Sequence, residues 1–286
     1  MTEMIERTET LQPEPAYALG ALLGVPVPDL ERGAGLPLLW HWVYLLDRPA
    51  QADLGPDGHP VRGTLPAPPR PGLRRMWAGG RVRTAGPLRC GLAATRLTSI
   101  RSVTEKQGRS GRLTFVTAGH QIRQGGEVVV DEEQDIVYRE PVTGPATGPA
   151  PAAGDDGPLV PAGGGEREIE VSPTLLFRFS ALIYNAHRIH YDRDFCRDVE
   201  GYPGLLTHGP LQALAMAEAA RAAAPAAAAG AGGGRGALRF EYRLISPLFD
   251  YQGLIVSASP GQEAATVTAA RDRHGRRTAS GMLTPG

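Results

Sequence analysis

The chain has 286 residues, of which 42% are hydrophobic and 21% charged, a composition typical of globular proteins with a sizeable apolar core. Its 30 basic and 30 acidic side chains balance, which argues against a nucleic-acid partner, because nucleic-acid binders usually carry a basic excess. Only two cysteines occur, Cys90 and Cys196, and no Cys/His cluster surrounds either. This argues against a disulfide scaffold or a zinc module, and we expect a cytoplasmic protein.

Neither the first residues nor any internal stretch predicts a membrane segment. The opening MTEMIERTE alternates charge and contains no apolar run of the signal-peptide type. The most apolar stretch, Leu36 to Leu46, stops at Asp47 and is shorter than the ~20 apolar residues that a spanning helix needs. We therefore expect no membrane partner.

Two stretches rich in helix and strand breakers divide the chain. Residues 141–165 are dense in Pro and Gly with almost no large apolar side chain, which predicts a linker. The Ala/Gly run at 222–236 contains Pro225 and predicts a surface loop. We therefore expect a first half over residues 1–140, a linker over 141–165 and a second half over 166–286.

The elements expected in chain order are mostly strands, with one or two helices in each half. Periodicity and β-branched content predict first-half strands at 81–88, 92–103, 111–124 and 127–140, after a short helix at 19–23 and a strand or helix at 36–46. In the second half we expect a strand ending near 171, helices at 173–182 and 210–223, and strands at 236–246, 253–259 and 264–271. Helices segregated to one face of antiparallel sheets predict an α+β fold, with one long helix in each half.

The densest polar cluster is Tyr184-Asn185-Ala186-His187-Arg188-Ile189-His190-Tyr191-Asp192, in the loop between the two second-half helices. Loops present side chains to clefts, and a histidine of near-neutral pKa can move a proton at pH 7. Asn185 lies five residues before His190 and could orient a water against it. The cluster therefore predicts an acid–base site.

His208-Gly209-Pro210 stands at the start of the next predicted helix. Proline suits the first helical position, and the preceding glycine leaves a backbone N–H open to a ligand oxygen. Such an N–H can stabilise an enolate-like oxygen. Together with the loop histidines, it would supply a base and an oxyanion donor.

Simpler interpretations stand beside this one. Two loop histidines can be structural or solvent-exposed, and a His-Gly-Pro start can be only a helix cap. His187 and His190 form an H-x-x-H pair, but no third ligand of suitable spacing lies near them in the sequence, so we expect no metal.

At these residues the sequence resembles a known family. RFSALIYNAHRIHYDRDFCRDVEGYPGLLTHGPLQA, starting at Arg178, is similar to the fatty-acid-synthase-type dehydratase branch of the MaoC-like hydratase group. That branch includes mesaconyl-CoA and itaconyl-CoA hydratases and the mitochondrial-type 3-hydroxyacyl-thioester dehydratases. The first half agrees through LGPDGHP at 54–60, RRMWAGGR at 74–81, EKQGRSGRLTFV at 105–116 and EEQDIVYRE at 132–140.

The resemblance implies a double hotdog fold, in which each half wraps an antiparallel sheet around a helix. It implies reversible hydration of a 2,3-enoyl thioester, with a short acyl or dicarboxylyl chain, without metal or redox cofactor. The wider group carries Asp-x-Asn-Pro-x-His in its active loop. Aligned without gaps, its His falls on His190 and its Asp on Asn185, while His187 and Arg188 occupy the Asn and Pro positions. Because Asn cannot accept a proton, His190 is the expected main acid/base, with His187 as the alternative.

The remaining site expectations concern the substrate. Gly209, beside His208, would donate its N–H to the thioester carbonyl, and Arg188 or Arg75 would hold a carboxylate or a CoA phosphate, since Arg matches planar anions. Arg188 could equally form a surface ion pair with Asp192 or Asp194. For Arg75, a solvated surface position is the favoured alternative. CoA and carrier-protein thioesters are not distinguished.

The first half lacks a counterpart of the 185–190 loop, and its His120 falls inside a predicted strand. The resemblance therefore implies a degenerate first half, one active site per chain at the face between the halves, and a possible homodimer of double hotdogs. Two other functions compete with hydration. One is a non-catalytic acyl-thioester-binding or assembly subunit, which Asn185 makes conceivable. The other is a thioesterase, for which Glu218 lies too far along its helix.

Overall fold

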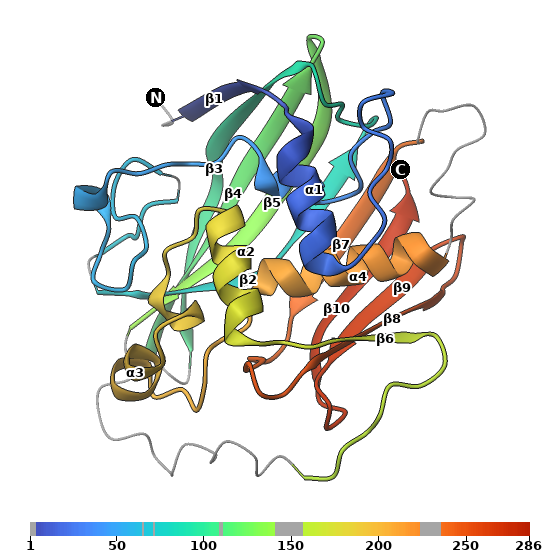
Figure 1. The fold of residues 1–286 in the computed structure, drawn as a ribbon. Coiled ribbons are helices and arrows are strands. Elements are labelled where there is room, and N and C mark those ends of the chain that lie inside the picture. The colour runs from blue at the N-terminus through green and yellow to red at the C-terminus, as the bar shows by residue number, and fades with distance from the viewer. Residues whose placement is uncertain (1–3, 65, 71, 109–110, 141–156, 224–235) are drawn as a thin grey trace.

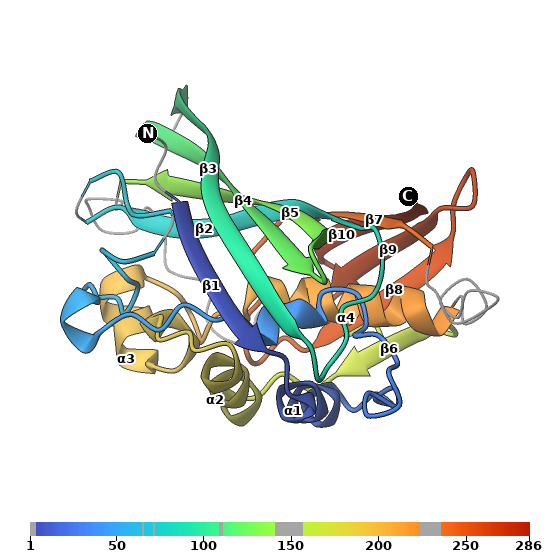
Figure 2. The same ribbon diagram turned by 90° about the horizontal axis from the view of Figure 1, so that it is seen from above.

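The computed structural model describes residues 4–64, 66–70, 72–108, 111–140, 157–223 and 236–286. Its main feature is one curved antiparallel sheet of ten strands in the order β1-β3-β4-β5-β2-β7-β10-β9-β8-β6 (Figures 1 and 2). The strands are β1 (Met4–Thr10), β2 (Arg74–Thr84), β3 (Ala93–Gly108), β4 (Gly111–Gln124), β5 (Glu127–Arg139), β6 (Glu166–Ile169), β7 (Leu238–Leu244), β8 (Leu254–Pro260), β9 (Thr266–Arg271) and β10 (Arg277–Pro285).

The two sides of the sheet meet where β2 pairs with β7. The register runs antiparallel from Gly79 opposite Arg243 to Thr84 opposite Leu238. Strands β1–β5 lie on one side of this seam and β6–β10 on the other, so backbone hydrogen bonds join the first half of the chain to the second. Residues 141–156 and 224–235 lie outside the described residues, so the predicted linker, domain boundaries and Ala/Gly loop stay predictions.

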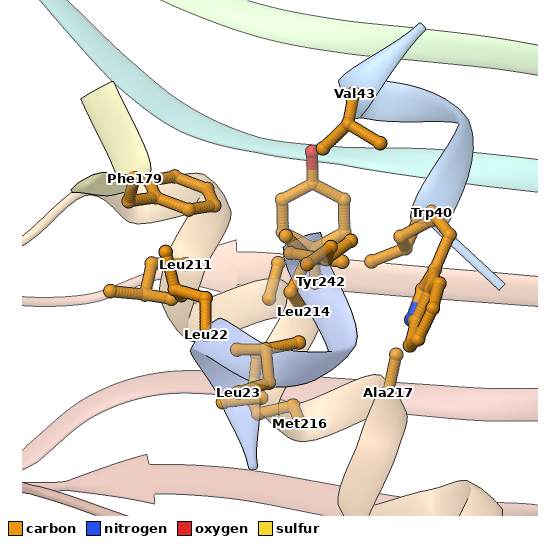
Figure 3. Packing of buried hydrophobic residues seen from close by; sticks show 14 of the residues in the cluster. Leu22, Leu23, Trp40, Val43, Phe179, Leu211, Leu214, Met216, Ala217 and Tyr242 are labelled. Atoms are coloured by element: carbon orange, nitrogen blue, oxygen red, sulfur yellow. The ribbon is translucent and has the colours of Figure 1, made fainter. Parts of the chain in front are cut away.

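Helix α4 (Gly209–Ala223) lies along the inner face of the sheet, against β8, β9, β10 and β2. Nine of its 15 residues are buried, which an amphipathic surface helix would not allow. Figure 3 shows Leu211, Leu214 and Met216 of this helix turned toward side chains from other elements. Burial of each large apolar side chain contributes about 1.5–3 kcal/mol to the stability of the fold. With most of its residues buried, α4 forms the centre of the core.

The other helices cover α4 from the side away from the sheet (Figure 2). Helix α1 (Pro13–Leu23) packs against α2 (Pro173–Leu182) and against the 3-10 turn η1 (Trp40–Val43). The Trp40 indole N–H reaches α4 and donates to Glu218 Oε1 at 2.8 Å. The halves therefore differ: the first-half helix has 11 residues and meets other helices and turns, whereas α4 has 15 and meets the sheet.

No helix in the described ranges combines the length and apolar character required to cross a lipid bilayer.

Candidate active site

The predicted 185–190 loop begins directly after α2 and is shaped by its own asparagine. Ser172 caps the start of α2 by accepting the N–H of Leu175 at 3.2 Å. Beyond the helix end, Asn185 Oδ1 accepts the backbone N–H of His187 at 2.9 Å. This Asx-turn occupies the amide oxygen and turns the chain into the 3-10 segment η3 (Arg188–His190). Asn185 thus fixes the loop backbone, and its NH2 group and the second lone pair of Oδ1 can still bind a water.

His190 is a buried imidazole with a defined tautomer. Its Nδ1 lies 2.7 Å from the carbonyl oxygen of Leu206, and because a carbonyl only accepts, Nδ1 carries the hydrogen. Nε2 therefore presents a lone pair. Burial lowers the pKa of His190 to about 3, although the contact with Leu206 raises it. The ring is neutral at pH 7 and can accept a proton through Nε2.

His208 stacks on His190, with ring centroids 3.5 Å apart and planes 17° from parallel. Its Nε2 shares a 2.8 Å hydrogen bond with the Ser180 hydroxyl, while its buried Nδ1 has no hydrogen-bond partner among the described residues. Gly209 follows as the first residue of α4, and a Cβ there would lie 2.3 Å from Leu244 Cδ1. The structure thus places the His190 ring beside the start of α4, whose first N–H groups lack partners within the helix.

His187 points toward the first half of the chain. Its ring centroid lies 3.9 Å from that of His59 and 5.5 Å from that of His190. Four imidazoles therefore follow one another in the order His59, His187, His190 and His208, which we call the histidine array. Burial lowers the pKa of His59 and that of His187, and the charges of neighbouring rings and of Arg75 lower the pKa of His187 further.

Asp57 adds a carboxylate at the His59 end of the array. Its Oδ2 lies 3.5 Å from His59 Nδ1 and 3.9 Å from His187 Nε2. Burial pushes the pKa of Asp57 up, but the contacts with His59 outweigh it and the net shift is downward. Asp57 is therefore ionised at neutral pH.

The turn that carries Asp57 and His59 is docked on the 185–190 loop. The Arg188 N–H donates to the Asp57 carbonyl at 2.8 Å. Gly58 has a φ of +85°, and a Cβ on it would lie 1.9 Å from the Ala186 carbonyl oxygen. Only glycine fits this approach without a shift of the backbone, so the contact between the two segments is specific.

The two candidate arginines differ in how they are engaged. Arg188 forms the ion pair with Asp192 that the sequence left open, at 2.8 Å, and its guanidinium lies 4.2 Å above the Phe195 ring. Arg75 lies on β2, and its charge lowers the pKa of both His59 and His187. In the part of the chain that the structure describes, no hydrogen bond or ion pair holds Arg75. Arg75 is thus the guanidinium available to an added anion.

A metal ion has a candidate set of ligands that the sequence did not indicate. One atom from each of Asp57, His59 and His187 lies within 4.8 Å of the other two. Neutral imidazoles and a carboxylate are suitable zinc ligands, but the nearby positive charge of Arg75 opposes a cation. The expectation of a site without metal stays a prediction.

Three other titratable side chains in the interior already have partners. His41 Nε2 lies 3.0 Å from Glu132 Oε2, and the His120 Nδ1 shares a 2.9 Å hydrogen bond with Thr98. His120 lies in β4, as predicted. On α4, the Glu218 carboxylate accepts from Trp40 and from Arg221 Nε, at 2.8 Å each, so it is not free to act as a thioesterase carboxylate.

The sequence prediction missed Asp57 and His59 as site residues. The segment LGPDGHP was noted for its resemblance, but it lies about 130 positions before His187, and only the fold brings the two together. The usable signal was the Asp-Gly-His spacing itself, which combines a carboxylate and an imidazole across a glycine turn.

Sequence comparisons identify relatives that act on acyl thioesters, by the names they carry. The family described as hydroxyacyl-thioester dehydratase type 2 matches residues 39–250. A mesaconyl-C(4)-CoA hydratase from Chloroflexus aurantiacus is 44% identical over 260 residues, covering 90% of this chain and 88% of that protein.

Solved structures support the fold. HtdX of Mycobacterium tuberculosis aligns with a TM-score of 0.65 at 14% identity, over 99% of this chain and all of its own. A second Mycobacterium tuberculosis protein, described as a double hotdog, aligns with a TM-score of 0.55 at 15% identity, over 99% of this chain and 94% of its own. These likenesses confirm the predicted α+β double hotdog.

Proposed function

Because this chain belongs to the hydroxyacyl-thioester dehydratase type 2 family, we propose that it catalyses reversible hydration of a 2,3-enoyl thioester to a 3-hydroxyacyl thioester. The observation that carries this proposal is the His190 imidazole. It is neutral, fixed by Leu206, and stacked beside the residue that precedes α4. A base therefore lies beside the N–H groups of a helix start. Addition of water to a conjugated carbonyl requires both a base and hydrogen-bond donors to the carbonyl oxygen.

In the hydration direction, the thioester carbonyl oxygen accepts from N–H groups at the start of α4, including that of Gly209. This polarises the double bond and stabilises the enolate-like oxygen, an effect that contributes roughly 3–4 kcal/mol for a single donor in other enzymes. The oxygen of water then bonds to C3 while its proton passes to His190 Nε2. That proton is returned to C2, so the enzyme ends unchanged and one water is added.

Asn185 and His187 have supporting roles in this proposal. Asn185 holds the water through its NH2 group, while its Oδ1 accepts from the backbone and keeps the loop in place. His187 adjoins His190 and is the alternative base. The reaction draws on no metal or redox cofactor. The possible homodimer stays a prediction.

We propose a short dicarboxylyl-CoA as the substrate class, with crotonyl-CoA-like chains as the simpler case. The support is the name of the Chloroflexus aurantiacus relative together with the unpaired Arg75. The test follows the conjugated thioester absorbance of mesaconyl-CoA and crotonyl-CoA with the purified protein. Turnover of neither by folded protein would contradict hydration, and binding of CoA esters without turnover would indicate the non-catalytic alternative.

Replacing Arg75 with Ala is expected to raise the KM for mesaconyl-CoA by roughly 10- to 100-fold. A charge-assisted hydrogen bond to the substrate carboxylate contributes about 1.5–3 kcal/mol, and it is made in both ground and transition states, so kcat changes little. Crotonyl-CoA lacks this carboxylate, and its KM should stay constant. Steady-state kinetics with both substrates measures the difference.

Arg81 is a matched control on the same strand, because Glu133 and Asp135 already hold it. Arg81→Ala should leave both KM values unchanged. An equal loss for both substrates in Arg75→Ala would instead indicate that Arg75 contacts the CoA moiety.

A further inference from the structure

The histidine array has one carboxylate in contact with it in the described residues, and that carboxylate comes from the first half. Asp57 Oδ2 faces both His59 and His187, at 3.5 and 3.9 Å. Glu200, another acid whose charge reaches Asp57, is held by Arg74 at 3.0 Å. Position 185, in the loop that carries His187 and His190, holds an amide and supplies no negative charge.

Local hydrogen bonds fix the Asp57 carboxylate in place. Within the turn, the Gly58 N–H donates to the Gly55 carbonyl at 2.9 Å, and the Gly55 N–H donates to the His59 carbonyl at 2.7 Å. Asp57 Oδ1 accepts the His59 backbone N–H at 3.0 Å. One carboxylate oxygen therefore shapes the turn, while the other is left to face the two rings.

Resting on the function proposed above, we propose that Asp57 supplies the negative charge of this active site, and that it acts as a positioning residue through His187. While the C3–O bond forms, the proton of water resides on an imidazole of the array, which becomes cationic. The groups facing His187 are the neutral rings of His59, His190 and His208, the cationic Arg75 and Asp57. Asp57 alone among these offsets the new charge.

The distance indicates how Asp57 acts. At 3.9 Å, Oδ2 is within ion-pair range of His187 Nε2 but beyond hydrogen-bond range. Its charge favours the tautomer of His187 with hydrogen on Nε2, which leaves Nδ1 as an acceptor, and it stabilises positive charge in the array. Asp57 itself takes no proton, and the proton from water still ends on C2.

The competing explanation is that Asp57 only shapes the turn through Oδ1. Asp57→Asn separates the two roles, because the amide oxygen can still accept the His59 N–H while the charge is lost. We expect kcat to fall about 10²-fold with KM within about threefold, and the melting temperature to stay near that of the wild type.

Two further variants sharpen the test. Asp57→Glu restores the charge on a longer side chain and should recover part of kcat. In a His187→Gln background, Asp57→Asn should cost little more, because the charge acts through that ring. Asp53 is the matched control, since it lies nearby and pairs with Arg62, so Asp53→Asn should keep the wild-type kcat.

The outcomes are distinguishable. Wild-type kcat in Asp57→Asn, with an active parent enzyme, would overturn the role of Asp57 alone. A lowered melting temperature in Asp57→Asn, with equal loss of kcat and no rescue in Asp57→Glu, would assign Asp57 to the turn and also overturn it. Absence of turnover by the wild-type protein on any enoyl thioester would overturn the proposed function itself.

Discussion

Replacing His190 with Asn is expected to lower kcat for enoyl-thioester hydration by at least about 10²-fold, with little change in KM. The Asn NH2 group can still donate toward the Leu206 carbonyl, so the local structure is kept while the basic Nε2 is removed. Because proton transfer is needed only as the C3–O bond forms, the loss should appear in kcat rather than in binding. Progress curves with crotonyl-CoA and mesaconyl-CoA measure both parameters.

His274→Asn is the control for a histidine substitution as such, since His274 contacts the carbonyl of Gly157 and lies outside the array. It should keep full activity. If His190→Asn were active and His187→Asn inactive, the base would be His187. Undiminished activity in both variants would remove the array from the mechanism.

Mild acid is expected to unfold the protein steeply as the pH falls below about 6.5. Burial lowers the pKa of five histidines. They are His59 and His120 in the first half and His187, His190 and His208 in the second. The pKa of His190 falls to about 3. The unfolded chain therefore takes up protons at pH values where the folded chain does not.

The sign follows from linkage. A folded pKa below the unfolded value means that stability is complete above the ordinary histidine pKa of about 6.5 and is lost as the pH falls toward the folded value. For each proton taken up on unfolding, the free energy of unfolding falls by about 1.4 kcal/mol with every pH unit of acidification. Several such histidines together would offset a typical stability of 5–15 kcal/mol within a few pH units.

Denaturant unfolding at a series of pH values between 7.5 and 5 measures this slope. His120→Asn, outside the proposed site, should make the slope shallower by about one proton, because the amide can still pair with Thr98. A free energy of unfolding that stays constant across this range would show that the buried imidazoles charge without unfolding.

The grouping of the second-half residues of the candidate site could be predicted from the sequence because these residues are local. Asn185, His187 and His190 lie within six positions, and His208 and Gly209 stand at the next helix start. Asp57 and His59 were missed because their contact with His187 depends on the docking of a distant turn. The Asp-Gly-His spacing could have marked the turn as a candidate, but it does not say that the turn docks on the 185–190 loop, a contact for which Gly58 is required.

The fold was predicted best where local pattern and final pairing agree. The strand predicted at 111–124 has the same bounds as β4, and the helices at 173–182 and 210–223 match α2 and α4 within one residue. The edge strand β1 was missed, since MIERTET is polar and gains its conformation by pairing with β3. Strand β10 was also missed, and its pairing with β7 and β9 is equally non-local.

The prediction of a strand or helix at 36–46 was wrong. This stretch forms only the short η1 turn, bounded by Leu39 and Leu45 in left-handed backbone conformations. Tertiary contacts hold it, because the indole of Trp40 binds Glu218 and the ring of His41 binds Glu132. Apolar content alone cannot separate such an anchored turn from regular structure.

The β2–β7 seam bears on how such a chain could arise. Two separate polypeptides meeting edge to edge would form the same hydrogen-bonded ladder, so fusion of a duplicated gene changes connectivity without changing the assembly. After fusion, each copy can diverge alone. One copy can then lose its own catalytic loop and add a single turn to the centre of its neighbour, and the segment around Gly58, docked against Ala186, lies where such a turn would be needed.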